Sequence, residues 1–501
     1  MMARFDRLER ITPLLRPWVR LFMLAAGLAG LTCQGACSTC PSAAQIHQTH
    51  RDAPINAPAD TPSPSEAAIG HITPEQAIET FDAAWTIIEQ THFDPAYNGV
   101  DWEGVRDELR PEAAASTTPE QLRKVLQSML DRLGQSHFAV IPGEVASLME
   151  ASSGRSSGSA RGASSPEGWP RIELRLVDGR VVVFRVEAGS RAQEEGVHPG
   201  MIVLSVGDHR VDELIDRLGA SLDERELALR VPGTVHAWMS GPLDERARVE
   251  FLDAHDEPIV VELSRQEPRG KPFKIGYLPA LPTYFQSRLL DESQTGSARI
   301  GLIRFNFWTI PINAPFGRAV DEMRDADGII IDLRGNPGGI GGLAPGLAGH
   351  FLSEPLSLGT MRTRDNRAEF RANPRRVTAD GRLVEPYAGP LAILVDATTG
   401  STSELFAAGM QGLGRARVFG QRSAGAALPS LVDRLPNGDS LLHATADFTG
   451  PDGTPIEGRG VIPDEPTPLR RQDLLAGVDA ALDAGVAWII SQGEASSAQQ
   501  R

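Results

Sequence analysis

Two segments in the second half of the chain pass from a short apolar run, through a glycine-bearing turn, into a helical pattern. They are "DGIIIDLRGNPGGIGGL" and "LAILVDATTGSTSELFAAGM". The apolar runs are typical of strands buried on both faces, and a similar run, "ARIGLIRF", precedes them. Strands that alternate with helices predict an α/β domain, which we place at residues 267–490 with a tail at 491–501.

A helical domain is expected over residues 71–150. The segments "TPEQAIETFDAAW" and "TPEQLRKVLQSML" both begin with Thr-Pro, in which threonine can cap a helix and proline suits its first turn. Phe81, Trp85 and Ile88 share one face of the first helix, as an amphipathic pattern requires.

A Gly/Ser-rich linker at 151–168 precedes a β-rich region at 169–266, which contains one short helix at 190–195. The stretch "VEAGSRAQEEGVHPGMIVLSVGD" in this region resembles PDZ domains. The resemblance implies an inserted PDZ-like domain that binds extended peptide ends. Pro170 lacks an amide where such domains capture a carboxylate, so a spacer or lid remains an alternative.

The N-terminal residues 1–40 have the pattern of a secretory signal. Arginines precede the short apolar run "LFMLAAGLAGL", which is too short to span a bilayer comfortably. Cys33 and Cys37 follow it and are candidates for lipidation. A Pro/Ala/Ser-rich tether occupies 41–70. We therefore expect an exported protein of the periplasm or cell envelope, with lipid anchoring to the membrane left open.

The charge of the chain argues against one class of partner. The net charge is −16, whereas nucleic-acid binding normally needs a basic surface. Only three of the 49 basic residues are lysines: Lys124, Lys271 and Lys274. No lysine therefore follows position 274, and this scarcity bears on the mechanism below.

Ser401 stands where the second apolar run ends and a helix begins. Free amides at a helix N-terminus favour developing negative charge, so a serine there is a candidate nucleophile. The alternative is structural, because Ser401-Thr402-Ser403-Glu404 also has the Ser-x-x-Glu pattern of a capping box.

The first glycine-bearing turn, residues 334–339, allows backbone amides to approach a ligand. Residues 339–344 match the nucleotide-loop pattern G-x-G-x-x-A, but an Asn-Pro turn separates them from the strand and no G-K-[ST] is present. The pattern does not favour phosphate binding.

Three motifs, "IDLRGNPGG", "GSTSELFAAGMQ" and "IEGRGVIPD", resemble the core of the C-terminal-processing and tricorn-type serine peptidases. The helical domain that ends in "LGQSHF" and the PDZ-like insert match the layout of that family. The resemblance implies a crotonase-like α/β core and makes Ser401 the nucleophile.

The family resemblance offers two general bases. One branch uses a lysine after the nucleophile, but Ala426 occupies that position here. The tricorn-like branch uses a serine–histidine pair and a glutamate, which correspond to Ser136, His137 and Glu457. An imidazole suits this role because it titrates near neutrality. Glu404 and Asp464 remain alternatives for the acidic residue.

The resemblance further assigns the oxyanion hole to the backbone amides of Gly339 and Thr402, and substrate contacts to Gly338 and Ile340. The cysteines and histidines show no metal-ligand spacing, so we expect no metal and no cofactor.

The expected function is that of an exported serine endopeptidase acting on peptides or proteins through an acyl-enzyme intermediate. A catalytically silent peptide- or ligand-binding module on the same fold is the alternative. A crotonase-type acyl-CoA enzyme is a third candidate, which the acidic chain and the PDZ-like insert disfavour. The sequence does not indicate the oligomeric state.

Overall fold

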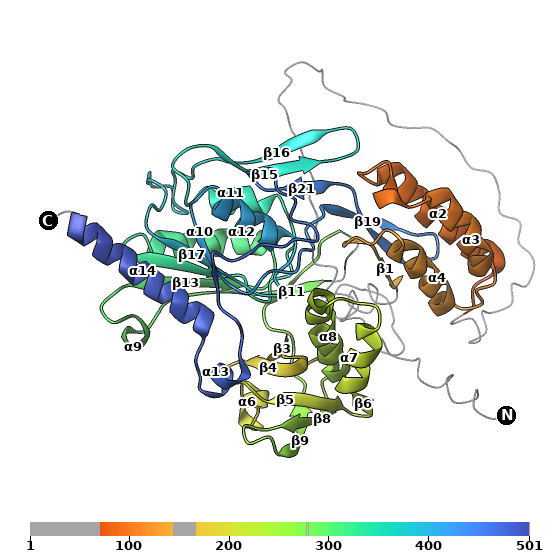
Figure 1. Cartoon of the computed structure of the whole chain (residues 1–501), viewed down its shortest axis with the longest axis horizontal. Helices are drawn as coiled ribbons and strands as arrows, with labels where there is room; N and C mark the ends of the chain where they lie inside the picture. Colours follow the sequence, from red (N-terminus) through yellow and green to blue (C-terminus); the bar gives the residue numbers. More distant parts are fainter. Residues whose placement is uncertain (1–70, 144–166, 277, 279, 500–501) are drawn as a thin grey trace, which may run out of the picture.

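The computed structural model describes residues 71–143, 167–276, 278 and 280–499. The predicted signal 1–40 with Cys33 and Cys37, the predicted tether 41–70 and most of the predicted linker lie outside these residues. Figure 1 shows a group of helices, a smaller β-rich unit and a larger part built round a sheet. This mixture of helices and sheets confirms the α/β class. No helix in the described ranges combines the length and apolar character needed to cross a membrane.

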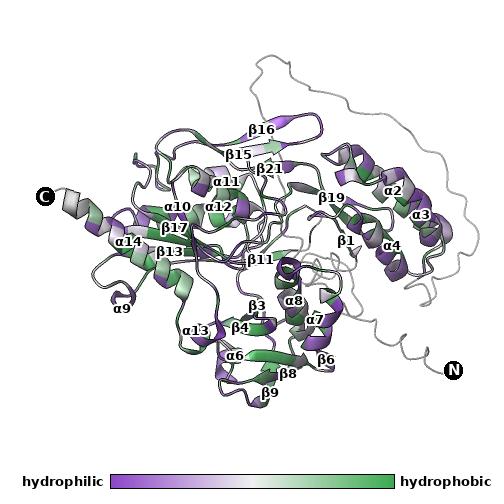
Figure 2. Ribbon diagram, in the orientation of Figure 1, coloured by the Kyte–Doolittle hydropathy of each residue, from purple (hydrophilic) through white to green (hydrophobic). Residues whose placement is uncertain are grey.

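The helical unit consists of α2 (Pro74–Thr91), the short 3-10 helix η1 (Tyr97–Gly99), α3 (Trp102–Ala114) and α4 (Pro119–Asp131). Thr73 and Thr118 cap α2 and α4 through their side chains, as the Thr-Pro pattern predicts. Phe81, Ile88 and Leu122 are buried between the helices. In Figure 2, α2 and α4 carry both hydrophilic and hydrophobic colours, as helices with one buried face should.

The helical unit is attached to a three-stranded sheet of the larger part. Strand β1 (Ala139–Ile141) pairs antiparallel with β20 (Ser440–Ala444), which also pairs with β19 (Ser430–Arg434). The Arg123 guanidinium of α4 donates to both carboxylate oxygens of Asp439 at 2.8 Å, and both side chains are buried. A buried, bidentate ion pair therefore fixes α4, and the chain that leaves it, against this sheet.

Removing one partner of this pair should weaken the attachment. We expect Asp439→Ala to lower the free energy of unfolding by about 3–5 kcal/mol, because Arg123 would stay buried without its carboxylate. Glu108→Ala, which breaks the exposed Arg132–Glu108 pair, should change it by less than about 1 kcal/mol. Urea unfolding of the two variants measures the difference, and equal small effects would contradict the attachment.

The β-rich unit contains a sheet with strand order β3-β4-β5-β8-β9. Its strands are β2 (Glu167–Gly168), β3 (Ile172–Val177), β4 (Arg180–Val186), β5 (Ile202–Val206), β6 (His209–Arg210), β7 (Gly241–Pro242), β8 (Arg246–Leu252) and β9 (Pro258–Ser264). Its helices are α6 (Arg191–Glu194), α7 (Val211–Gly219) and α8 (Glu224–Met239).

Helix α6 falls within the short helix predicted at residues 190–195, whereas no predicted element corresponds to α7 or α8. The signal for α8 is weak because Pro232 and Gly233 lie inside the helix and disfavour it locally. A capping box of Asp223 and Glu226 begins α8, and Val231 and Val235 anchor it in the core of the unit.

The main sheet has the order β12-β13-β14-β17-β18-β22. Its strands are β12 (Phe285–Leu289), β13 (Ile300–Phe305), β14 (Gly328–Asp332), β17 (Leu391–Val395), β18 (Arg417–Gly420) and β22 (Glu465–Pro466). All neighbouring pairs are parallel except β12–β13. The helices of this part are α9 (Glu292–Thr295), η2 (Ile310–Ile312), α10 (Asn313–Glu322), α11 (Leu343–Ala348), α12 (Thr402–Gly412), α13 (Arg471–Leu475) and α14 (Ala480–Gln499). Its other strands are β10 (Lys271–Phe273), β11 (Leu281–Thr283), β15 (Leu356–Arg362), β16 (Arg367–Ala372) and β21 (Asp447–Thr449).

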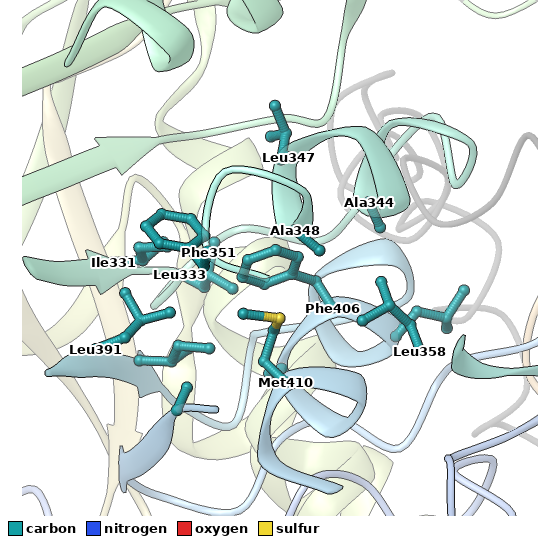
Figure 3. Packing of buried hydrophobic residues seen from close by; sticks show 14 of the residues in the cluster. Ile331, Leu333, Ala344, Leu347, Ala348, Phe351, Leu358, Leu391, Phe406 and Met410 are labelled. Carbon is teal, nitrogen blue, oxygen red and sulfur yellow. The ribbon is translucent and has the colours of Figure 1, made fainter. Parts of the chain in front are cut away.

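Both faces of the main sheet are covered, which explains why β17 and residues 329–331 of β14 are apolar. Ile331 and Leu391 pack with Phe406 and Met410 of α12, and Figure 3 shows these side chains pointing into one cluster. Ile330 of β14, with Ala392 and Leu394 of β17, packs against α14 on the opposite face. Successive strand residues point to opposite faces, so burial of both faces requires a continuous apolar run.

Helix α14 runs to Gln499, so the tail predicted for residues 491–501 is wrong for most of its length. Leu482, Val486 and Ile489 of α14 are buried against the main sheet. These contacts anchor the first half of the helix. Its second half contains Gln492, Glu494 and Ala495, which favour the helical conformation.

Candidate active site

Ser401 lies between the end of β17 and the first turn of α12, as the sequence predicts. Its φ of 51° and ψ of −120° are unusual for a residue other than glycine. Its N–H donates to the Ala426 carbonyl at 2.8 Å and to the Glu404 carboxylate at 2.9 Å. Strained backbone of this kind persists where surrounding contacts impose it, and it concentrates at functional sites.

The glycine-bearing turn after β14 lies directly against Ser401. A Cβ atom placed on Gly338 would lie 2.7 Å from the Ser401 Cβ and 3.0 Å from the Thr402 nitrogen. A Cβ on Gly339 would lie 2.4 Å from the Trp308 carbonyl oxygen. Both glycines have positive φ, so only glycine fits this close approach.

The amides of Gly339 and Thr402 are available at this junction. Within the described part of the chain, neither N–H takes part in a backbone hydrogen bond, whereas the Gly338 N–H donates to Asn336 Oδ1 at 3.0 Å. The Thr402 hydroxyl donates to the Gly339 carbonyl at 2.9 Å and ties the two loops together. One amide at the N-terminus of α12 and one in the facing glycine turn can together stabilise an oxyanion.

Two further buried residues, Trp308 and Asn336, hold these loops. Trp308 donates its Nε1 proton to Ser403 Oγ at 2.8 Å. Its backbone N–H donates to the Gly338 carbonyl, and its carbonyl accepts the Ile340 N–H. The Asn336 carbonyl accepts the Gly400 N–H at 3.1 Å, so it bridges the glycine turn and the nucleophile loop. The "NPGG" stretch marks Asn336 as a turn residue but does not reveal this second contact.

Ser136, His137 and Glu457 form one hydrogen-bonded group. The Ser136 hydroxyl lies 2.6 Å from His137 Nδ1 and donates to Glu457 Oε2 at 2.9 Å. The Ser136 N–H donates to Glu457 Oε1 at 2.8 Å. His137 has a φ of 63° and, with Ser401, is among the few described residues other than glycine with positive φ.

Residues 423–427 connect this group to Ser401. Glu404 accepts hydrogen bonds from Ser423 Oγ and the Gly425 N–H, both at 2.6 Å, and from the Ala426 N–H at 3.0 Å. Glu457 accepts the next amide, that of Ala427, at 2.8 Å. Two carboxylates therefore hold consecutive amides of one segment, so the position of Ser401 is tied to that of Ser136 and His137.

Both carboxyl groups are shifted by their surroundings. Burial raises the pKa of Glu404 to about 7, although hydrogen bonds from Ser423, Gly425 and Ser401 act against it. The nearby Glu457 carboxylate raises the pKa of Glu404 further, because two like charges in one buried site repel. Burial also raises the pKa of Glu457 above its ordinary value.

The other predicted candidates lie elsewhere or have other partners. Asp464 accepts the Val418 N–H at 2.8 Å, which is a contact within the main sheet. The backbone of Ile340 donates to the Trp308 carbonyl, and its side chain packs in a neighbouring apolar cluster. His443 is a further buried histidine, whose ring contacts Thr91 and Asp433 at the base of the helical unit. In the described ranges no group of three or more His, Cys, Asp or Glu side chains could hold a metal ion.

The chain is similar in sequence and in fold to known peptidases. Residues 299–467 match the model of peptidase family S41, and residues 74–131 match that of the tricorn protease C1 domain. A carboxyl-terminal-processing protease of Synechocystis sp. is 25% identical over 76% of this chain and 79% of its own length. Tricorn protease homolog 1 of Streptomyces coelicolor is 23% identical over 84% of this chain and 36% of its own. The structure of a photosystem II D1 C-terminal processing protease aligns with a TM-score of 0.52 and 20% identity, covering 81% of this chain and 98% of that one.

Proposed function

The chain belongs to the C-terminal-processing and tricorn-type family of serine peptidases, and we propose that it hydrolyses peptide bonds through an acyl-enzyme formed on Ser401. The observation that carries the proposal is the connection of Ser401, through residues 423–427, to the Ser136–His137–Glu457 group. Because relatives are named as carboxyl-terminal-processing proteases, we expect cleavage near the C-terminal end of a peptide or protein substrate.

The residues take the following roles in this proposal. His137 accepts the Ser401 hydroxyl proton as Oγ attacks the carbonyl carbon, and returns it to the leaving amine. The contact between Ser136 and Nδ1 leaves Nε2 as the nitrogen for this transfer. Glu457 orients Ser136, while the Gly339 and Thr402 amides bind the oxyanion. Water then attacks the acyl-enzyme, again with His137 as base.

The larger architecture follows the same proposal. We assign a crotonase-like core to the main sheet and a PDZ-like fold to the β-rich unit, in which β3 is an edge strand. Export rests on the N-terminal sequence pattern, and Cys33 and Cys37 remain candidates for lipidation. The contact of Gly338 with Ser401 supports its role at the substrate-binding turn.

Labelling with a fluorophosphonate probe tests the function. We expect one covalent adduct, which peptide mapping places on Ser401, because the probe reports an activated serine. Ser403 is a control within the same tryptic peptide, since its hydroxyl is already an acceptor for Trp308. An unlabelled, folded protein, or an adduct on another serine, would refute the peptidase assignment.

Glu404→Gln should lower kcat by about ten- to a hundredfold and leave KM within about twofold. The amide offers one acceptor oxygen, whereas donors from Ser401, Ser423, Gly425 and Ala426 converge on the carboxylate. Displacement of the reacting groups by about 1 Å is enough for such a loss.

Glu195→Gln is the matched control for this variant. Glu195 also accepts a serine hydroxyl, at 2.6 Å, and a backbone N–H, at 3.0 Å, but it lies in the β-rich unit. Steady-state kinetics and thermal melts of both variants separate positioning from stability. If Glu404→Gln lowers only the melting temperature, as Glu195→Gln would, Glu404 does not position the nucleophile.

A further inference from the structure

A cavity of about 620 Å³ lies between the β-rich unit and the main sheet. Strands β3 and β4 and helix α8 form one wall, and β12, β13 and the start of the glycine turn form the other. Gly335 and Thr398 line it, so it reaches the two loops that carry the candidate active site. Its size is within the range of about 300–1,000 Å³ that is usual for ligand sites.

The charge of the cavity is opposite to that of the chain. Seven arginines and four carboxylates line it, although the whole chain has a net charge of −16. Such a cleft concentrates anions, because its protein walls focus the field of the lining charges.

Two guanidinium groups of the cavity are only partly hydrogen-bonded by the described residues: Arg175 Nε donates to Asp396 at 2.7 Å, but its Nη2 reaches Glu173 only at 3.6 Å. Arg304 and Arg334 bind Glu173 and Asp332 at short distances, and Arg185 reaches the same two carboxylates only at 3.6 and 3.4 Å. Burial and the charges of Arg304 and Arg334 lower the pKa of Arg185. Nη1 of Arg185 and Nη2 of the buried Arg175 are buried atoms without a hydrogen-bond partner among the described residues.

The mouth of the cavity shows the same excess of positive charge. Glu187 is shared by Arg171, at 3.1 Å, and by Arg269, at 3.5 Å. Among the described residues, Arg288 forms its ion pair with the exposed Asp291, at 3.9 Å. Additional carboxylates can therefore pair with guanidinium groups at the mouth, while the buried arginines inside add to the attraction.

We propose that this cavity binds an acidic segment of the peptide substrate, whose carboxylates pair with Arg269 and Arg288 at the mouth and are attracted by the positive potential of the buried Arg185 and Arg175 inside. The proposal rests on the proposed peptidase function, and it adds the substrate class. A peptide fits better than a small anion because the cavity continues from β3, an edge strand, to the loops beside Ser401.

Peptide binding to the full-length Ser401→Ala protein tests this proposal. Two fluorescein-labelled peptides of equal length are compared by anisotropy at low and high salt, one with glutamates and the other with glutamines at the same positions. We expect at least tenfold tighter binding of the glutamate peptide at low salt and a smaller difference at high salt. Equal affinities, or a preference that salt does not change, would overturn the proposal.

Variants at the mouth locate the site. Arg269→Gln should weaken the glutamate peptide by about fivefold and leave the glutamine peptide unchanged. Arg417→Gln is a matched control, because Arg417 does not line the cavity. The two side chains have similar surroundings: Arg417 is 42% exposed and lies 3.4 Å from one carboxylate, and Arg269 is 41% exposed and lies 3.5 Å from one. Each guanidinium group also lies over an aromatic ring. Equal effects of the two variants would place binding elsewhere. Because the nucleophile is absent, this result is independent of the labelling of Ser401 in the unaltered protein.

Discussion

Ser401→Ala abolishes peptide hydrolysis, with kcat expected to fall on the order of a millionfold, while the thermal melt stays nearly unchanged. In the proposed mechanism the hydroxyl supplies the attacking oxygen, so its removal would eliminate the acyl-enzyme route. The protein should keep its fold because the Ser401 backbone contacts with Ala426 and Glu404 do not need the hydroxyl.

Ser403→Ala serves as the control, because it should lower stability and leave the reactivity of Ser401 intact. The Ser403 hydroxyl is buried and accepts the Trp308 indole proton, so its loss leaves a buried donor without an acceptor. We expect a loss of about 1–3 kcal/mol in stability and an adduct that still forms on Ser401. If Ser401 were only a helix cap, Ser401→Ala would lower stability by about 1 kcal/mol and spare activity. A destabilised but active Ser401→Ala protein would therefore reject the nucleophile.

The local elements of the active site could be predicted from the sequence because their signals are local. An apolar run, a glycine turn and a helical pattern place Ser401 between β17 and α12. The capping alternative also has a basis in the structure, since Glu404 does accept the Ser401 N–H. The same carboxylate binds three groups of residues 423–427, and this role depends on a segment about 20 residues further along the chain.

Contacts between distant segments could not be predicted in this way. Ser136 and Glu457 are separated by 321 residues, and no periodicity indicates that they meet. Their meeting depends on the pairing of β1 with β20 and on the buried Arg123–Asp439 pair. The role of Trp308 likewise depends on two loops that follow different strands and lie close together. No local sequence pattern indicates this approach.

The second large effect concerns the general base. We expect His137→Ala to remove activity, and kcat/KM of the unaltered protein to rise with pH, because only a neutral imidazole accepts the Ser401 proton. An imidazole has a pKa of about 6.5 before perturbation by the protein. The pKa of Glu404 is raised to about 7, so this carboxyl group also loses its proton over the same pH range. Glu404→Gln separates the two groups, because the pH dependence should persist in that variant if it belongs to His137.

A lysine supplied at the position used by the other branch of the family completes the test. In the double variant His137→Ala, Ala426→Lys, we expect no full recovery of activity. The Ala426 backbone is already fixed by Ser401 and by the Glu404 carboxylate, and this buried carboxylate would favour a charged lysine, which cannot accept a proton. We would measure the pH–rate profiles of the parent and the three variants together. Full activity in His137→Ala, or a base that titrates only near about 9–10 as a lysine or tyrosine would, would show that the base is misidentified. His443 would be a poor replacement, since it is fully buried and its two ring nitrogens contact Thr91 and Asp433.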